Sequence, residues 1–190
     1  MLINDSIIEG CVAGKRSAQS DLYHKYSGVM LSICLRYAQN RDEAEDILQE
    51  AFLKIFQNIR SYRKEGSFEG WMKRVIINHA LNYYRKNRKM PFLEDIESIN
   101  ETDIMDNEEQ SGSHAPVSAE TLIAVIQLLP PGYRMVFNLY VFEEFSHKEI
   151  SEALNISENT SKTQLLKARR MLRKKLFDLN LMKNTAFVNE

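Results

Sequence analysis

Helical periodicity runs through most of this chain and restricts the folds that are open to it. Apolar residues recur every three or four positions over long stretches, and no stretch shows the sustained alternation of a β-strand. Only seven glycines and four prolines interrupt the 190 residues. The pattern therefore predicts an all-α protein, with helices over 2–14, 17–40, 42–60 and 68–88 in its first half.

The stretch 42–60 carries an apolar stripe wide enough to bury one helix face. Its members recur at i, i+1, i+4 and i+5 and are Ile47, Leu48, Ala51, Phe52, Ile55, Phe56 and Ile59. Acidic residues gather in the first turns of the same stretch, where the positive end of a helix dipole favours them. Helix stability alone accounts for such acids in an ordinary protein, so their functional meaning depends on further evidence.

The net charge of −1 hides a strong segregation of charge along the chain. Residues 60–89 include nine basic and two acidic residues, and residues 148–175 include eight basic and three acidic residues. Between them, 91–121 holds nine acids and no Lys or Arg. Two separate basic stretches predict two contacts with one polyanion.

The acidic, polar segment 91–116 is unsuited to packing a core and predicts a flexible linker between two domains. The chain then divides into a helical domain over 1–90, the linker 91–116, a second helical domain over 117–180 and a tail over 181–190. No run of apolar residues reaches the ~18 positions of a membrane span, and the first residues lack a secretion-signal pattern. We therefore expect a cytoplasmic protein without membrane insertion.

The second domain contains the signature of a helix-turn-helix. Helices are predicted over 118–128 and 131–143, the latter opened by Pro131. Ser146 and Glu149 have capping-box spacing at the start of a helix over 147–154, which Asn155 ends, and Ser157 caps the next helix. That last helix is expected to turn Leu165, Leu166, Ala168, Met171 and Leu172 inward. A helical hairpin that binds no DNA has the same local pattern.

In a helix-turn-helix the second helix enters the major groove, with its first residues at the base edges. Asn and Gln pair with adenine, Lys donates to guanine and Glu accepts from cytosine. Basic residues further along neutralise phosphates. The candidates for contacts with DNA are Glu158, Asn159, Thr160, Ser161, Lys162, Thr163, Gln164, Lys167 and Arg170.

Two long stretches resemble one known family. The segment "LPPGYRMVFNLYVFEEFSHKEISEALNISENTSKTQLLKARRMLRKKL" resembles region 4 of the extracytoplasmic-function (ECF) sigma factors. Residues 21–86, with the motif "DEAEDILQEAF", resemble their region 2. Few proteins that carry a helix-turn-helix also carry this upstream motif, so the resemblance is specific.

The resemblance implies partners and roles. It implies binding to core RNA polymerase, to promoter DNA and to an anti-sigma factor. In the family the acidic helix of region 2 binds the clamp helices of the polymerase, which here points to Asp42, Glu45, Asp46, Gln49 and Glu50. The following loop and helix read and open the −10 element, which points to Arg60, Tyr62, Arg63, Lys64, Arg74, Asn78, Asn82, Arg85 and Lys86.

Two positions depart from the family pattern. Asn82 stands where the family often has Asp, and Ser161 stands where it usually has Val. Ser161 is expected to be partly exposed on the recognition helix and to affect promoter preference. The linker corresponds to a segment that runs toward the active-centre cleft in family complexes, although a plain tether fits its composition equally well.

The single tryptophan lies in "GSFEGWMKR", among basic residues that suggest base stacking. Phe68, Trp71, Val75 and Ile76 nevertheless have the i, i+3, i+7, i+8 spacing of a buried face, so Trp71 is predicted to belong to the core.

The chain shows no set of nucleophile, base and oxyanion donors and no phosphate-binding glycine loop, so we expect neither an enzyme nor a cofactor. The same features leave two alternatives to a sigma factor. One is a helix-turn-helix regulator that does not bind the polymerase core, and the other is a helical adaptor whose basic faces bind acidic proteins.

Overall fold

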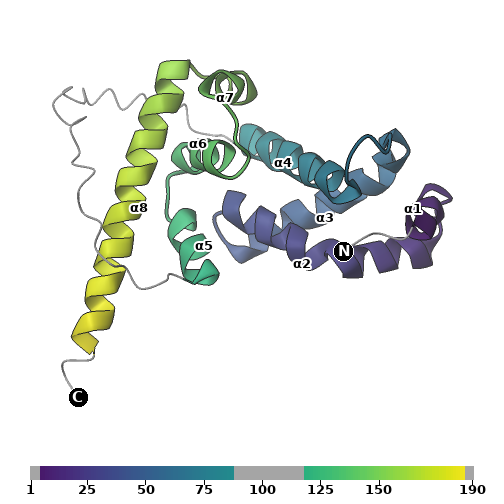
Figure 1. Ribbon diagram of the computed structural model, residues 1–190, viewed down its shortest axis with the longest axis horizontal. Coiled ribbons are helices and arrows are strands. Elements are labelled where there is room, and N and C mark those ends of the chain that lie inside the picture. The colour runs from purple at the N-terminus through teal and green to yellow at the C-terminus, as the bar shows by residue number, and fades with distance from the viewer. Residues whose placement is uncertain (1–4, 88–117, 187–190) are drawn as a thin grey trace.

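The computed structural model describes residues 5–87 and 118–186, and every regular element in these ranges is helical. Two bundles lie side by side, the first built from α1 to α4 and the second from α5 to α8 (Figure 1). The predicted all-α, two-domain architecture is therefore confirmed. The predicted linker 91–116 lies outside the described residues.

The helices of the first domain are α1 (Asp5–Val12), α2 (Arg16–Tyr37), α3 (Arg41–Asn58), the short 3-10 helix η1 (Ile59–Ser61) and α4 (Phe68–Asn87). The helices of the second domain are α5 (Ala119–Gln127), α6 (Pro131–Val141), α7 (His147–Leu154) and α8 (Glu158–Ala186). The last helix continues through the first six residues of the segment 181–190 that the sequence assigned to a tail.

Local signals set most of the helix boundaries. Gly14, at φ 72°, allows the tight turn between α1 and α2. Asn40 caps α3 by accepting a hydrogen bond from the Glu43 amide at 2.8 Å. Ser67 does the same for α4, with the Gly70 amide at 3.0 Å.

The apolar stripe of α3 forms the centre of the first domain, as the sequence predicts. Ile47, Leu48, Phe52 and Ile55 are all less than 5% exposed and lie between α2 and α4. Burial of each such side chain contributes roughly 1.5–3 kcal/mol relative to an exposed position. The face of α3 opposite this stripe is thereby left for solvent and partners.

Trp71 packs against the core from its edge. Its indole stacks on Phe68 with 5.4 Å between ring centroids, and Tyr62 contacts it from the loop before α4 at 5.9 Å. Phe68 is only 3% exposed, whereas Trp71 is half-buried. The predicted packing role is confirmed, with part of the indole still open to solvent.

We expect Trp71→Ala to lower the free energy of unfolding by about 2–3 kcal/mol, below the full cost of a buried tryptophan because the site is half-buried. Urea denaturation followed by circular dichroism measures this change. Leu53→Ala, at a position 61% exposed on α3, is the matched control and should stay within about 0.5 kcal/mol of the wild type. A stable Trp71→Ala variant that fails only in opening DNA would contradict the packing role.

Candidate nucleic-acid and protein interfaces

The polar face of α3 is an exposed acidic stripe. Asp42, Asp46, Gln49 and Glu50 are exposed, and Glu45 is half-buried beside them. Positions 42, 45, 46 and 49 follow i, i+3, i+4 and i+7 spacing, so their side chains share one side of the helix. Arg41 pairs with Glu45 at 2.7 Å and partly neutralises the first turn. Leu53, 61% exposed, continues the stripe with an apolar contact point.

Glu50 is tied to the helix behind it through His79 of α4. The His79 ring is 5% exposed, and its Nδ1 lies 2.8 Å from the Lys54 ammonium. An ammonium group only donates, so Nδ1 accepts and the ring proton of the neutral imidazole sits on Nε2. This Nε2 lies 3.1 Å from the Glu50 carboxylate, but the geometry is not that of a hydrogen bond. The contact of the imidazole with Lys54 thus links α3 to α4 next to the acidic stripe.

The environment of His79 disfavours its protonation. Burial is the main cause that lowers its pKa, and the Lys54 charge lowers it further, while Glu50 opposes both. The folded pKa therefore lies below the ordinary value of about 6.5.

The loop between α3 and α4 is held by contacts at both of its ends. Arg60 donates to the Val12 carbonyl at 3.5 Å, and Lys64 pairs with Asp5 at 3.3 Å, so α1 contacts this loop at two points. Lys64 itself has a left-handed backbone with φ 59°. Tyr62 donates to the Gly66 carbonyl at 2.6 Å and packs its ring on Phe68. Tyr62 is therefore used within the fold, while Arg60, Arg63 and Lys64 are exposed.

A polar stripe runs along the exposed side of α4. Its five members are all exposed and recur at spacings of three, four or one position; they are Arg74, Asn78, Asn82, Arg85 and Lys86. Asn82 accepts a hydrogen bond from Arg85 at 3.2 Å. Arg85 also donates to the Ala153 carbonyl of α7, in the second domain. The structure thus brings all five predicted residues of α4 onto one surface.

The second domain contains the predicted helix-turn-helix. Ser146 and Glu149 form a full capping box, and Asn155 ends α7 in the left-handed conformation with φ 53°. Ser157 accepts from the Thr160 amide at 3.0 Å and so caps α8. Capping box, turn residue and second cap are all confirmed.

The start of α8 divides into outward and inward residues. Glu158, Asn159 and Lys162 are exposed, and Arg170 is exposed further along. Thr160, Thr163 and Lys167 are half-buried. Gln164 is 6% exposed and Ser161 is fully buried, so both face the domain interior.

The expectation that Ser161 is partly exposed is wrong. Its hydroxyl lies 2.9 Å from His147 Nδ1, and His147 stacks on Tyr140 of α6 with 4.8 Å between ring centroids. Three helices are joined through this imidazole, which the sequence pattern did not indicate. The expected inward position of Leu166 is also wrong, because it is 40% exposed on the same side as Lys162 and Arg170.

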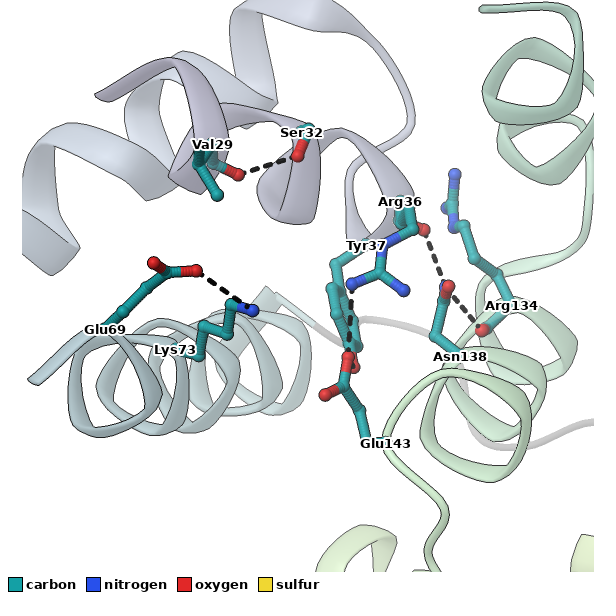
Figure 2. Close-up of polar contacts among 9 residues, drawn as sticks. All are labelled: Val29, Ser32, Arg36, Tyr37, Glu69, Lys73, Arg134, Asn138 and Glu143. Carbon is teal, nitrogen blue, oxygen red and sulfur yellow. Dashed lines mark hydrogen bonds and ion pairs between the residues drawn. The ribbon is translucent and has the colours of Figure 1, made fainter. Parts of the chain in front are cut away.

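Four polar residues of α5, α6 and the turn after them were not foreseen either. Gln127, Arg134, Asn138 and Glu143 contact the C-terminal end of α2 across the two domains. Figure 2 shows the contact of Asn138 with the Arg36 carbonyl and those of Glu143 with Arg36 and Tyr37. Arg134 and Asn138, at i and i+4 within an otherwise apolar helix, are the one sequence signal for this contact.

Comparison with known proteins agrees with this architecture. The family model "Sigma-70 region 2" matches residues 22–90, and "Sigma-70, region 4" matches residues 119–172. The ECF RNA polymerase sigma factor SigW of Bacillus subtilis is 32% identical over 87% of this chain and 92% of its own length. SigM of the same organism is 31% identical over 80% of this chain and 91% of its own.

Among solved structures, the sigma factor RpoE in complex with the anti-sigma factor NepR from Bartonella quintana matches with a TM-score of 0.47. It is 16% identical and covers 83% of this chain and 97% of that one.

The two family models match the two helical domains, and the matches to relatives cover most of the chain. The protein is therefore a sigma factor of the sigma-70 class. The chain belongs to the ECF RNA polymerase sigma factors. Along residues 5–87 and 118–186, no helix is both long and apolar enough to cross a membrane.

The lowered pKa of His79 predicts a stability that depends on pH. Below about pH 6.5 the imidazole takes up a proton more readily in the unfolded chain than in the folded one. The free energy of unfolding therefore decreases as the pH is lowered. Burial and Lys162 lower the pKa of His147 in the same direction. We expect urea denaturation to show a clear loss of stability from pH 7.5 to 5.5. The loss should be smaller in His79→Gln, and an equal loss would contradict the assignment.

Proposed function

We propose that this sigma factor binds core RNA polymerase through the acidic stripe of α3. The observation that carries the proposal is that the stripe lies on the solvent-facing side of α3, while the opposite side of this helix is buried in the core. Carboxylates fixed on a rigid helix attract a basic partner surface and orient it. Leu53, exposed at the end of the stripe, adds apolar area to the same contact.

Promoter DNA is bound through two further surfaces in this proposal. The basic loop residues Arg60, Arg63 and Lys64 and the polar stripe of α4 hold the −10 element, whose opening requires bases to leave the stack. The exposed first turn of α8 reads the −35 element in the major groove. Glu158, Asn159 and Lys162 are our candidates for the base contacts, since they are exposed whereas Ser161 and Gln164 are buried.

The remaining expectations follow from the same role. The protein acts in the cytoplasm as a binding factor without catalytic chemistry or cofactor, and the polymerase supplies the reaction. An anti-sigma factor holds it inactive, as the family resemblance implies.

Charge reversal on α3 tests the polymerase contact. We expect Asp46→Lys to reduce capture of core polymerase at least tenfold in a pull-down, because a fixed carboxylate becomes a repelling charge. Glu9→Lys, an exposed acid on α1, is the matched control and should capture polymerase normally. Full capture by Asp46→Lys would contradict the assignment of the acidic stripe of α3 as the polymerase contact.

Arg170→Ala tests the phosphate contacts of α8. We expect weaker binding to −35 duplex DNA, with the slope of log affinity against log salt reduced by about 1 for one lost phosphate contact. Fluorescence anisotropy over a salt series measures both quantities. Lys15→Ala, exposed in the first domain, is the control. An unchanged slope in Arg170→Ala would remove this residue from the interface.

A further inference from the structure

The buried hydroxyl of Ser161 and the imidazole of His147 form a polar pair inside the second domain, beside the surface proposed to bind DNA. We propose that His147 is a proton-dependent contact for a DNA phosphate, and that Ser161 is the positioning residue that lets the ring carry the proton. This inference rests on the proposed function and deepens it, because it makes DNA binding by the second domain depend on pH.

Contacts from two other helices hold the ring of His147, which is the first residue of α7. Its Nδ1 lies 2.9 Å from the hydroxyl of Ser161 on α8, and Ser161 itself is 0% exposed. The ring also stacks on Tyr140 of α6, with 4.8 Å between centroids and 27° between the ring planes. The Arg169 guanidinium lies over the same tyrosine ring at 5.5 Å. The orientation of the imidazole is therefore set by α6 and α8 together.

The second ring nitrogen of His147 is available to a ligand. Within residues 5–87 and 118–186, its Nε2 has no hydrogen-bond partner, and it is not among the buried polar atoms that lack one. The residue as a whole is half-buried. Because Nδ1 is turned toward the buried hydroxyl of Ser161, Nε2 is the ring nitrogen that solvent or a ligand reaches.

The surroundings of this nitrogen suit an anion. The first helix of a helix-turn-helix crosses the sugar-phosphate backbone while the second enters the groove, and His147 begins the first of the two. On α8, Lys162 and Arg169 are exposed and act electrostatically on the ring, and Glu158 is the one acid of that helix that opposes them.

The other elements add few charges around the ring. Tyr140 is the titratable group that α6 places against it. On α7 itself, Lys148 and Glu149 follow His147 in the sequence, and both are exposed. The α4 helix reaches α7 at the opposite end, where Arg85 contacts Ala153. Basic groups therefore outnumber acidic ones near His147, and a phosphate of the bound duplex is the anion that the proposed function brings there.

The hydroxyl of Ser161 serves both charge states of the imidazole. A hydroxyl group donates or accepts, so it can donate to Nδ1 of the neutral ring and accept from Nδ1–H of the charged ring without a change of position. In both states Nε2 carries the proton that a phosphate oxygen accepts. A valine, which the family usually has at this position, would leave the Nδ1–H of the charged ring without a partner inside the domain, and such a buried donor is costly.

The sign of the pH dependence follows from the charges. Burial and then the charge of Lys162 lower the pKa of His147 in the free protein, so its ring is mostly neutral at neutral pH. A phosphate beside Nε2 favours the charged ring and raises this pKa in the complex. DNA binding therefore takes up a proton, and affinity rises as the pH is lowered through the range between the two pKa values.

Fluorescence anisotropy of the full chain with a labelled −35 duplex, at pH values from about 8 to about 6, tests the inference. We expect wild-type affinity to rise about fivefold over this range, because the phosphate stabilises the charged ring. His147→Gln keeps a polar side chain but has no proton to take up, so its affinity should change little with pH and should be about fivefold below the wild type at the acidic end. His24→Gln, at an exposed histidine of α2, is the matched control and should follow the wild type.

Two variants of equal shape separate the hydroxyl of Ser161 from its packing. Ser161→Val removes the hydroxyl and should flatten the pH profile, whereas Ser161→Thr adds the same bulk, keeps the hydroxyl and should retain the profile. A scrambled duplex separates phosphate from base contacts, because phosphates are the same in every sequence. The rise in affinity at low pH should therefore be equal on the −35 duplex and on the scrambled one. Should Ser161→Val fail to fold, His147→Gln and Ser161→Thr still decide the matter.

A flat profile in the wild type, or a wild-type profile in His147→Gln, would overturn the proton-dependent contact. A wild-type profile in Ser161→Val, or a flat one in Ser161→Thr, would overturn the positioning role and leave the hydroxyl a purely structural one. A pH effect confined to the −35 sequence would indicate a base contact and overturn the phosphate contact. Failure of the wild type to bind either duplex would instead refute the proposed function of α8, and this inference with it.

Discussion

A buried guanidinium joins the two halves of this protein. Arg134 is 1% exposed, and its Nη1 donates both to Ala38 in the first domain and to Gln127 in the second. Burial lowers its pKa, yet an arginine keeps its proton, so its charge has to be matched by acceptors. Removal of a charge from water costs several kcal/mol and is tolerated only with such partners. Arg134 is the most deeply buried charged residue that holds α6 against the end of α2, and Asn138 contacts the same helix end beside it.

The contact between the two domains is mainly polar. Hydrogen bonds to Leu35, Arg36 and Ala38 are replaced by water when the domains part, so the cost of opening is modest compared with that of an apolar interface. The surfaces proposed for partners lie outside this contact, with the exception of Arg85. Its guanidinium links the region proposed to hold the −10 strand to α7.

The sequence predicts what is decided by neighbours along the chain. The stripe of α3, the capping box at Ser146 and the left-handed Asn155 follow from local rules, and each is confirmed. The polar residues of α4 fall on one face for the same reason. Their contacts with DNA, and those of the acidic stripe with polymerase, stay predictions, because a single chain shows exposure and charge but no partner.

Burial and partners that depend on tertiary packing could not be predicted from the sequence. Ser161 reads as a polar recognition-helix residue, but the half-buried His147 ring gives its hydroxyl a partner inside the domain. Leu166 reads as core, but the packing of α8 on α6 leaves it outside. Arg134 and Asn138 read as interruptions of an apolar helix, and only the fold reveals that their acceptors lie about a hundred residues away.

Run-off transcription with purified core polymerase tests the central claim most directly. The template carries a −35 and a −10 element selected by this chain, and matched templates have either element scrambled. The account predicts a transcript only when chain, core polymerase and both elements are present together. Equal transcription from the scrambled templates, or none from the intact one at low salt, would contradict it.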